Sequence, residues 1–74
     1  YMRIHINKLS PEGDTLVSTV EGDQIKPTLQ ELLDLPEHFV AIENDVVLSI
    51  DEAMTRLAGL EEAQVLIGKQ VAGG

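Results

Sequence analysis

A short leucine-rich stretch between runs of β-branched residues is the feature that most limits the fold of this chain. Residues 28–35, TLQELLDL, repeat leucine at i, i+3 and i+4 from Leu29, which produces one apolar helical face. Thr28 and Glu31 match a capping box at its start, and Pro36 ends the helix at the preceding residue at the latest. A helix of about two turns is unstable alone, so it has to pack against other elements.

Strand patterns precede this helix. Residues 2–7 alternate apolar and polar side chains, a period of two that predicts a half-buried strand. Residues 15–20 are rich in β-branched side chains and predict a second strand. The turn-forming residues 10–14, SPEGD, lie between them, so a β-hairpin is the expected connection.

Further strands and a second helix follow the leucine-rich helix. Strands are predicted at residues 39–43, 46–48 and 64–67, with a turn at Asn44-Asp45. Ser49 and Glu52 form a second capping box, which opens a short helix that runs through Leu57. Gly59 fits the C-terminal cap of that helix.

The order of these elements predicts one α+β domain over residues 1–74. Strands on both sides of the main helix indicate a mixed sheet, with this helix packed on one face and the short second helix beside it. The apolar positions expected to form the core are Ile4, Ile6, Val17, Leu29, Leu32, Leu33, Val40, Ile42, Leu57, Leu60, Val65 and Ile67.

The composition limits the possible chemistry and partners. The chain has no cysteine, which excludes a disulfide, a cysteine-based zinc site and a cysteine nucleophile. Its net charge of -8, from 13 acidic and five basic residues, disfavours nucleic acid because phosphates would be repelled. No apolar run is long enough to cross a membrane, and a signal-peptide pattern is lacking, so we expect a soluble cytoplasmic protein with no membrane partner. Tyr1 before Met2 is interpreted as a remnant of expression or processing.

The last residues combine small side chains with a terminal carboxylate. Glycine has no Cβ, so Gly73 and Gly74 can thread a channel too narrow for a side chain. Ala72 keeps this end slim, and Val71 precedes it within a tail, at about residues 69–74, that we expect to be flexible. An unhindered glycine carboxylate suits conversion to an acyl-adenylate. A frayed end without function is the structural alternative.

Three segments in this order resemble the ThiS/MoaD family of sulfur carriers. They are residues 28–33 (TLQELL), residues 39–44 (FVAIEN) and the final Val71-Ala72-Gly73-Gly74, and the resemblance spans residues 2–74. It implies the β-grasp, ubiquitin-like fold. The carrier in this family is a protein substrate rather than an enzyme, and it binds no cofactor itself.

The resemblance also implies a reaction and its partners. A ThiF/MoeB-like adenylating enzyme would use ATP and Mg²⁺ to activate the carboxylate of Gly74, which then becomes a thiocarboxylate. Val71, Ala72 and Gly73 would enter the partner's active site. A thiazole synthase, or another sulfur-accepting synthase, would then take the sulfur.

Several segments differ from the family pattern. The hairpin at residues 8–23 is longer than expected for a thiamine-type carrier, and Asn44-Asp45 stands where Asn-Gly is usual. Residues 59–62 (GLEE) replace an acidic-glycine turn. Before the small tail, residues 68–71 (GKQV) stand where the molybdopterin branch often has Pro-Pro-Val, which favours sulfur delivery to the thiamine thiazole.

Two other functional classes fit the same features. Gly74 could be joined to lysines of target proteins, as in a ubiquitin-like modifier, or the chain could be an interaction domain without tail chemistry. An apolar docking patch is expected on the sheet face away from the helix, with Val47 and Leu66 as candidates. His5 and His38 are interpreted as surface or structural residues, and the many carboxylates as a solvated acidic face.

Overall fold

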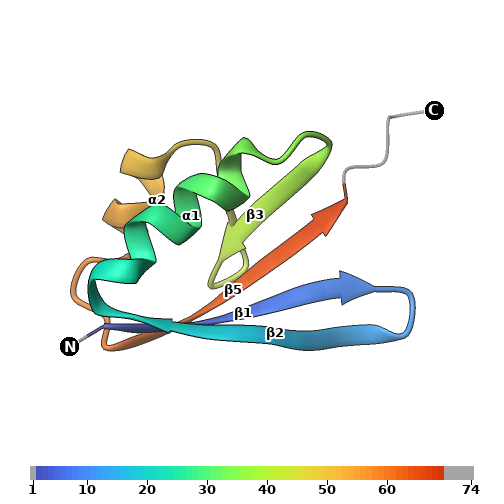
Figure 1. The fold of residues 1–74 in the computed structure, drawn as a ribbon, viewed down its shortest axis with the longest axis horizontal. Coiled ribbons are helices and arrows are strands. Elements are labelled where there is room, and N and C mark those ends of the chain that lie inside the picture. Colours follow the sequence, from blue (N-terminus) through green and yellow to red (C-terminus); the bar gives the residue numbers. More distant parts are fainter. Residues whose placement is uncertain (1, 70–74) are drawn as a thin grey trace.

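The computed structural model describes residues 2–69, and Tyr1 and residues 70–74 lie outside the described part. The elements in chain order are β1 (Arg3–Ser10), β2 (Gly13–Glu21), the 3-10 turn η1 (Gly22–Gln24), α1 (Ile25–Asp34), β3 (His38–Ile42), β4 (Asp45–Val47), α2 (Ile50–Leu57) and β5 (Glu62–Lys69). They confirm an α+β architecture. Figure 1 shows α1 and α2 on the same side of the sheet.

The five strands form one mixed sheet in the order β2-β1-β5-β3-β4. The central pair, β1 and β5, is parallel, whereas β1 pairs with β2, and β3 with both β4 and β5, in antiparallel fashion. The first and last strands of the described chain are therefore neighbours, and the β3–β4 hairpin lies on the far side of β5. Each strand then has one face toward the helices and one face away from them.

The main helix begins earlier than the capping box predicted. Its first residue is Ile25, its N-cap is Gln24 without a side-chain cap hydrogen bond, and Thr28 lies inside the helix. The predicted start was wrong because η1 leads directly into the helix. Pro27 is tolerated in the first turn, where backbone N–H groups have no intrahelical acceptor. The earlier start buries Ile25 in the core.

Ser49 is confirmed as the N-cap of α2, whereas the return bond of Glu52 goes to Leu48, one residue before the cap. Ser49 Oγ accepts a hydrogen bond from the backbone N–H of Glu52 at 3.2 Å, and Glu52 Oε2 accepts one from the backbone N–H of Leu48 at 3.3 Å. Gly59, with φ +83°, follows the end of α2 in the left-handed region, as predicted for a helix terminator. Local side-chain hydrogen bonds thus fix the start of α2, in contrast to α1.

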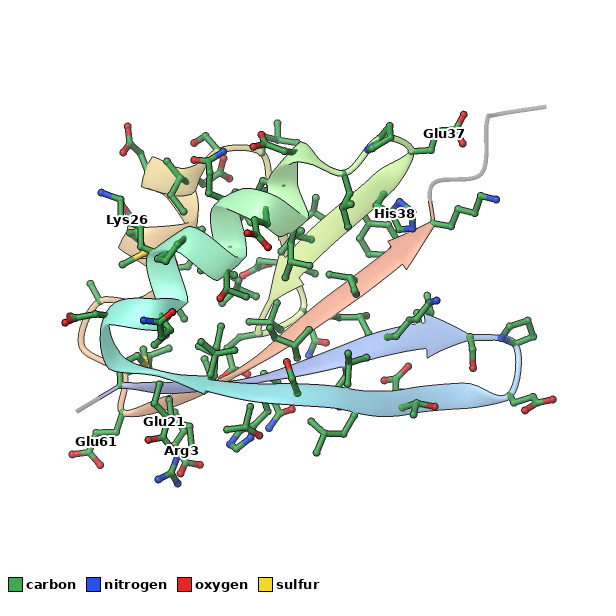
Figure 2. The ribbon with its side chains drawn as sticks, in the orientation of Figure 1. Arg3, Glu21, Lys26, Glu37, His38 and Glu61 are labelled. Carbon is green, nitrogen blue, oxygen red and sulfur yellow. The ribbon has the colours of Figure 1, made fainter. Side chains whose placement is uncertain are left out.

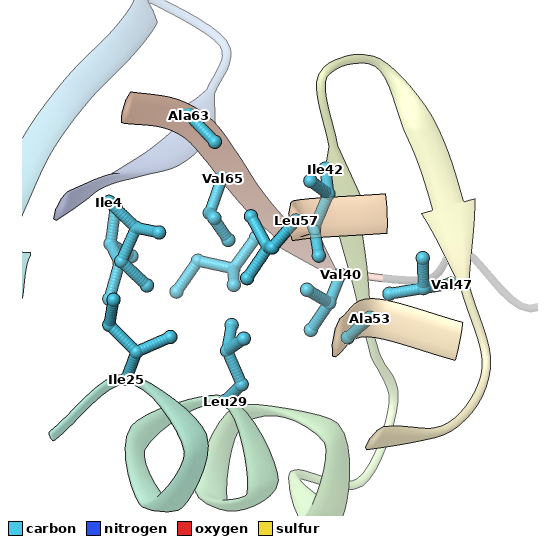
Figure 3. Close-up of a cluster of buried hydrophobic side chains, with 12 residues drawn as sticks. Ile4, Ile25, Leu29, Val40, Ile42, Val47, Ala53, Leu57, Ala63 and Val65 are labelled. Atoms are coloured by element: carbon cyan, nitrogen blue, oxygen red, sulfur yellow. The ribbon is translucent and has the colours of Figure 1, made fainter. Parts of the chain in front are cut away.

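The core lies between the helices and the inner face of the sheet (Figure 3). Its members are Ile4, Ile6, Ile25, Leu29, Val40, Ile42, Val47, Ala53, Leu57, Ala63, Val65 and Ile67. Leu32 and Leu33 pack against this cluster and are partly buried. The core is therefore built largely of β-branched side chains from β1, β3 and β5.

Two expected core residues are exposed. Val17 is 57% exposed, because the β1–β2 register shifts between Ile6 and Asn7 and leaves Val17 as the extra residue of a β-bulge. Leu60 is 40% exposed and lies in the loop between α2 and β5. Both predictions were wrong, since periodicity alone reveals neither a bulge nor the path of a loop.

The β3–β4 turn lies one residue earlier than predicted. Glu43 and Asn44 have φ of 49° and 71°, and Ile42 pairs with Asp45 across the turn. Two consecutive residues with positive φ match the two-residue type I′ hairpin loop. The turn is therefore Glu43-Asn44, which has Asn in the second position where Gly is common.

Candidate docking surface on the outer face of the sheet

The face of the sheet away from the helices carries an apolar patch, the outer patch. It comprises Leu9, Phe39, Ala41, Val46 and Leu66. The pairing places these residues on one face, because Ala41 is opposite Leu66 on β5 and opposite Val46 on β4. Phe39 is opposite Gly68, whose neighbourhood also includes Leu9. The patch therefore crosses β1, β5, β3 and β4 near the end of β5.

The end of the patch nearest Lys69 depends on a glycine. A Cβ at position 68 would lie 2.6 Å from Cε2 and 2.7 Å from Cζ of Phe39, so the aromatic ring lies directly on the Gly68 backbone. The same Cβ would be 3.5 Å from Leu9 Cβ. Any side chain here would displace the ring. Gly68 itself is buried beneath these neighbours.

The patch combines a covered centre with exposed surroundings. Ala41 is only 4% exposed although it points away from the helices, because its larger neighbours cover it. Val46 is 52% exposed and Leu9 is 46% exposed, while Phe39 and Leu66 are half-buried. Exposed apolar groups gathered in this way mark interaction sites more often than isolated ones do.

One predicted docking residue lies on this face and the other does not. Leu66 is half-buried in the outer patch, where alternation along β5 placed it. Val47 is 2% exposed and belongs to the core, so its expected exposure was wrong. The reason is the strand phase of β4: Val47 pairs with the buried Val40, and Val46 faces outward instead. Phe39 and Gly68 were missed, because only the register brings them together.

The predicted tail residues lie outside the described part of the chain. The expected roles in the tail therefore stay predictions for Val71, Ala72, Gly73 and Gly74. The described chain reaches Lys69, which pairs with His38 on β3. The His38 ring nitrogen Nδ1 lies 2.8 Å from the carbonyl oxygen of Pro36. Figure 2 shows His38 beside the end of β5.

The opposite end of the outer face is polar. Arg3 Nε lies 2.9 Å from Glu21 Oε1, and Figure 2 shows these two residues side by side. Arg3 Nη1 also lies 3.2 Å from Glu62 Oε1, so Arg3 joins β1 to both of its neighbours. His5 Nε2 lies 3.5 Å from Glu62 Oε2, and His5 Nδ1 lies 3.2 Å from Thr19 Oγ1. The two Arg3 pairs are surface ion pairs, each of which contributes about 0–1 kcal/mol to stability. Their placement agrees with a structural reading of His5.

A third feature is an open hollow of about 620 Å³ on the helix side. Its apolar lining comes mainly from Met2, Ile25, Met54 and Leu57, with Lys26 at the start of α1. Sequence reasoning gave no sign of it, because it arises where the start of α1 approaches the end of α2.

Within residues 2–69, no group of three or more His, Asp or Glu side chains is arranged to hold a metal ion. None of the helices described here has the length and apolarity needed to cross a membrane. Comparison of the chain with protein-family models, with curated proteins and with solved structures finds no match.

Proposed function

We propose that this chain is a β-grasp sulfur carrier of the ThiS/MoaD type, activated at the carboxylate of Gly74. The observation that carries the proposal is the strand order β2-β1-β5-β3-β4, with a parallel β1–β5 pair at the centre and α1 packed on one face. A mixed sheet with its main helix on one face is compatible with the β-grasp fold that the sequence resemblance implies. In the sequence, β5 leads directly into the small residues that the family uses as its reactive end.

The proposed reaction uses the carrier as a substrate. A carboxylate oxygen of Gly74 attacks the α-phosphorus of ATP and pyrophosphate leaves, which forms an acyl-adenylate. Hydrosulfide from the sulfur donor then attacks the acyl carbon, AMP leaves and the S–H proton passes to solvent, so that one oxygen of the carboxylate is replaced by sulfur. ATP, Mg²⁺ and the sulfur donor belong to the ThiF/MoeB-like partner. A thiazole synthase is the proposed acceptor.

The outer patch is the proposed contact with the adenylating partner. It combines exposed apolar area with a position at the end of β5, from which the chain continues toward Gly74. The net charge of -8 would attract a partner whose binding site has a basic rim, and this mainly accelerates association.

The test is intact mass spectrometry after incubation with a ThiF/MoeB-like enzyme, ATP, Mg²⁺ and a sulfur donor. We expect the mass to rise by the difference between one sulfur and one oxygen atom, and one residue added after Gly74 should abolish the change. If transfer persists on the extended chain without its removal, the proposed chemistry is refuted. Lysine-linked Gly-Gly adducts on other proteins, with no thiocarboxylate, would indicate the modifier class instead.

A matched pair of variants tests the docking surface. Val46→Glu places a charge in the outer patch at an exposed site, whereas Gln30→Glu adds the same charge on exposed α1. We expect the first to raise the KM of adenylation for the carrier and the second to leave it unchanged. Equal effects of the two variants would exclude the outer patch as the docking site.

A further inference from the structure

The edge strand β2 is long, and it is exposed. It has nine residues at one margin of the sheet, whereas the strand at the other margin, β4, has three. Residues 13–19 are all exposed, and Figure 1 shows β2 as the outermost strand along the sheet. An edge strand directs backbone N–H and C=O groups away from its neighbour, and these groups form a template for another strand.

The interior of β2 lacks the charges that commonly protect such an edge. Residues 15–20, TLVSTV, have no charged side chain and no proline, although 24% of the chain is charged. Leu16 is 58% exposed and Val17 is 57% exposed. Lysine and proline are the residues that usually prevent edge pairing. This edge is therefore chemically suited to accept a strand.

The ends of β2 are acidic. Between Leu9 and Ile25 the sequence has four acidic residues and no lysine or arginine, and one of the four, Glu21, pairs with Arg3 of β1. Glu12, Asp14 and Asp23 have no ion-pair partner among the residues that the structure describes. An incoming strand would thus meet an uncharged centre between two negative ends.

This charge pattern distinguishes between possible occupants. A second copy of the chain would bring another net charge of -8 and the same acidic ends against this edge. The bulge at Val17 also twists this edge, so an incoming strand has to follow the twist, which a flexible extended peptide does more readily than the fixed β2 edge of a second copy. A strand with basic ends has complementary charge, and like-charge repulsion is absent.

We propose that the β2 edge binds an extended segment of a partner protein as an added strand. The segment has an apolar or β-branched centre, which pairs along Thr15–Val20, and lysine or arginine residues at both ends, which face the acidic ends of β2. Main-chain hydrogen bonds supply the affinity, and the basic ends supply the selectivity. This inference goes beyond the proposed function, because it involves neither the tail nor the outer patch.

The experiment titrates ¹⁵N-labelled full chain with a synthetic peptide of alternating valine and threonine flanked by two lysines at each end. We expect amide chemical-shift changes centred on residues 15–20 and slower hydrogen exchange at the outward N–H groups of β2. A peptide with glutamate flanks should bind about tenfold more weakly or worse, and added salt should weaken the lysine peptide. A peptide with two central prolines should not bind.

A charge reversal provides the matched comparison. Glu12→Lys with Asp14→Lys should weaken the lysine-flanked peptide and strengthen the glutamate-flanked one. Glu31→Lys with Asp34→Lys makes the same change in net charge on α1 and should not reverse the preference. Shift changes confined to other elements, equal binding of the proline peptide, or self-association of the free chain through β2 would each overturn the proposal. None of these measurements uses an adenylating enzyme, so the result is independent of sulfur transfer.

Discussion

Replacement of Gly68 by alanine tests the close approach between β5 and Phe39. The new Cβ would lie 2.6 Å from Cε2 of the ring, which has to move by about 0.8 Å to reach an ordinary contact of 3.4 Å. The ring is the far end of a side chain on the outer face, so it can move, but it would lose its packing on the β5 backbone.

Two opposing terms determine the size of the effect. Alanine in a strand interior is more favourable than glycine by roughly 0.5–1 kcal/mol, because glycine loses more backbone entropy on folding. Forcing extra atoms into a packed site costs about 1–3 kcal/mol. We therefore expect Gly68→Ala to reduce the free energy of unfolding by up to about 2.5 kcal/mol. If Phe39→Ala is introduced first, the second term disappears and Gly68→Ala should stabilise by about 0.5–1 kcal/mol.

The assay is urea denaturation of the wild type, both single variants and the double variant. The predicted result is a change of sign: the same substitution at Gly68 destabilises with Phe39 present and stabilises with Phe39 absent. The coupling free energy from this cycle isolates the contact. If Gly68→Ala has the same effect in both backgrounds, the ring does not pack on the β5 backbone and the argument is refuted.

Three further substitutions test the fold. Leu29→Ala removes a fully buried side chain and should lower the free energy of unfolding, measured by chemical denaturation, by about 2–5 kcal/mol. This is a large share of the roughly 4–11 kcal/mol of total stability expected for 74 residues. A loss below about 1 kcal/mol would contradict the core position of Leu29. Ser49→Ala removes the N-cap acceptor of α2 and should lower the free energy of unfolding by about 1 kcal/mol. Thr28 lies inside α1 and caps no helix, so Thr28→Ala should not cause this loss. Glu43→Asn should stabilise by about 0.5–1 kcal/mol because asparagine adopts positive φ more readily, and Glu43→Gln, which removes only the charge, should not reproduce the gain.

The two capping boxes show how far local sequence predicts local structure. Ser49 acts as the predicted N-cap, because its own backbone is extended and α2 begins directly after it. Thr28 and Glu31 have the same pattern but lie within α1, because η1 and the buried Ile25 already commit the preceding residues to a helix. A short motif of this kind predicts a helix, and its neighbours decide where that helix begins.

The candidate site was predictable only in part. Alternation along β5 placed Leu66 on the outer face, since a regular strand preserves its phase. The phase of β4 was not predictable, because it depends on whether the turn is Glu43-Asn44 or Asn44-Asp45, and the difference of one residue exchanges Val46 and Val47 between surface and core. The contact of Phe39 with Gly68 arises from pairing between strands separated by a helix, which no local pattern contains.

The position of the outer patch limits how a partner could reach the proposed reactive carboxylate. β5 is paired on both sides, and its inner face is buried, so Lys69 is a fixed point from which the proposed tail extends. The five residues from Gln70 to Gly74 span at most about 18 Å when fully extended. Under the proposed function, a partner that binds Phe39 and Leu66 therefore needs its nucleotide site within about 18 Å of the end of β5. Glycine and alanine at the end of this tail would fit a narrow channel. A partner docked on the sheet would point the tail toward that channel. The hollow between α1 and α2 lies at the other end of the domain from the end of β5 (Figure 1). If the partner docked there, the tail would have to run back along the domain before it reached the nucleotide site. We therefore assign the adenylating contact to the outer patch.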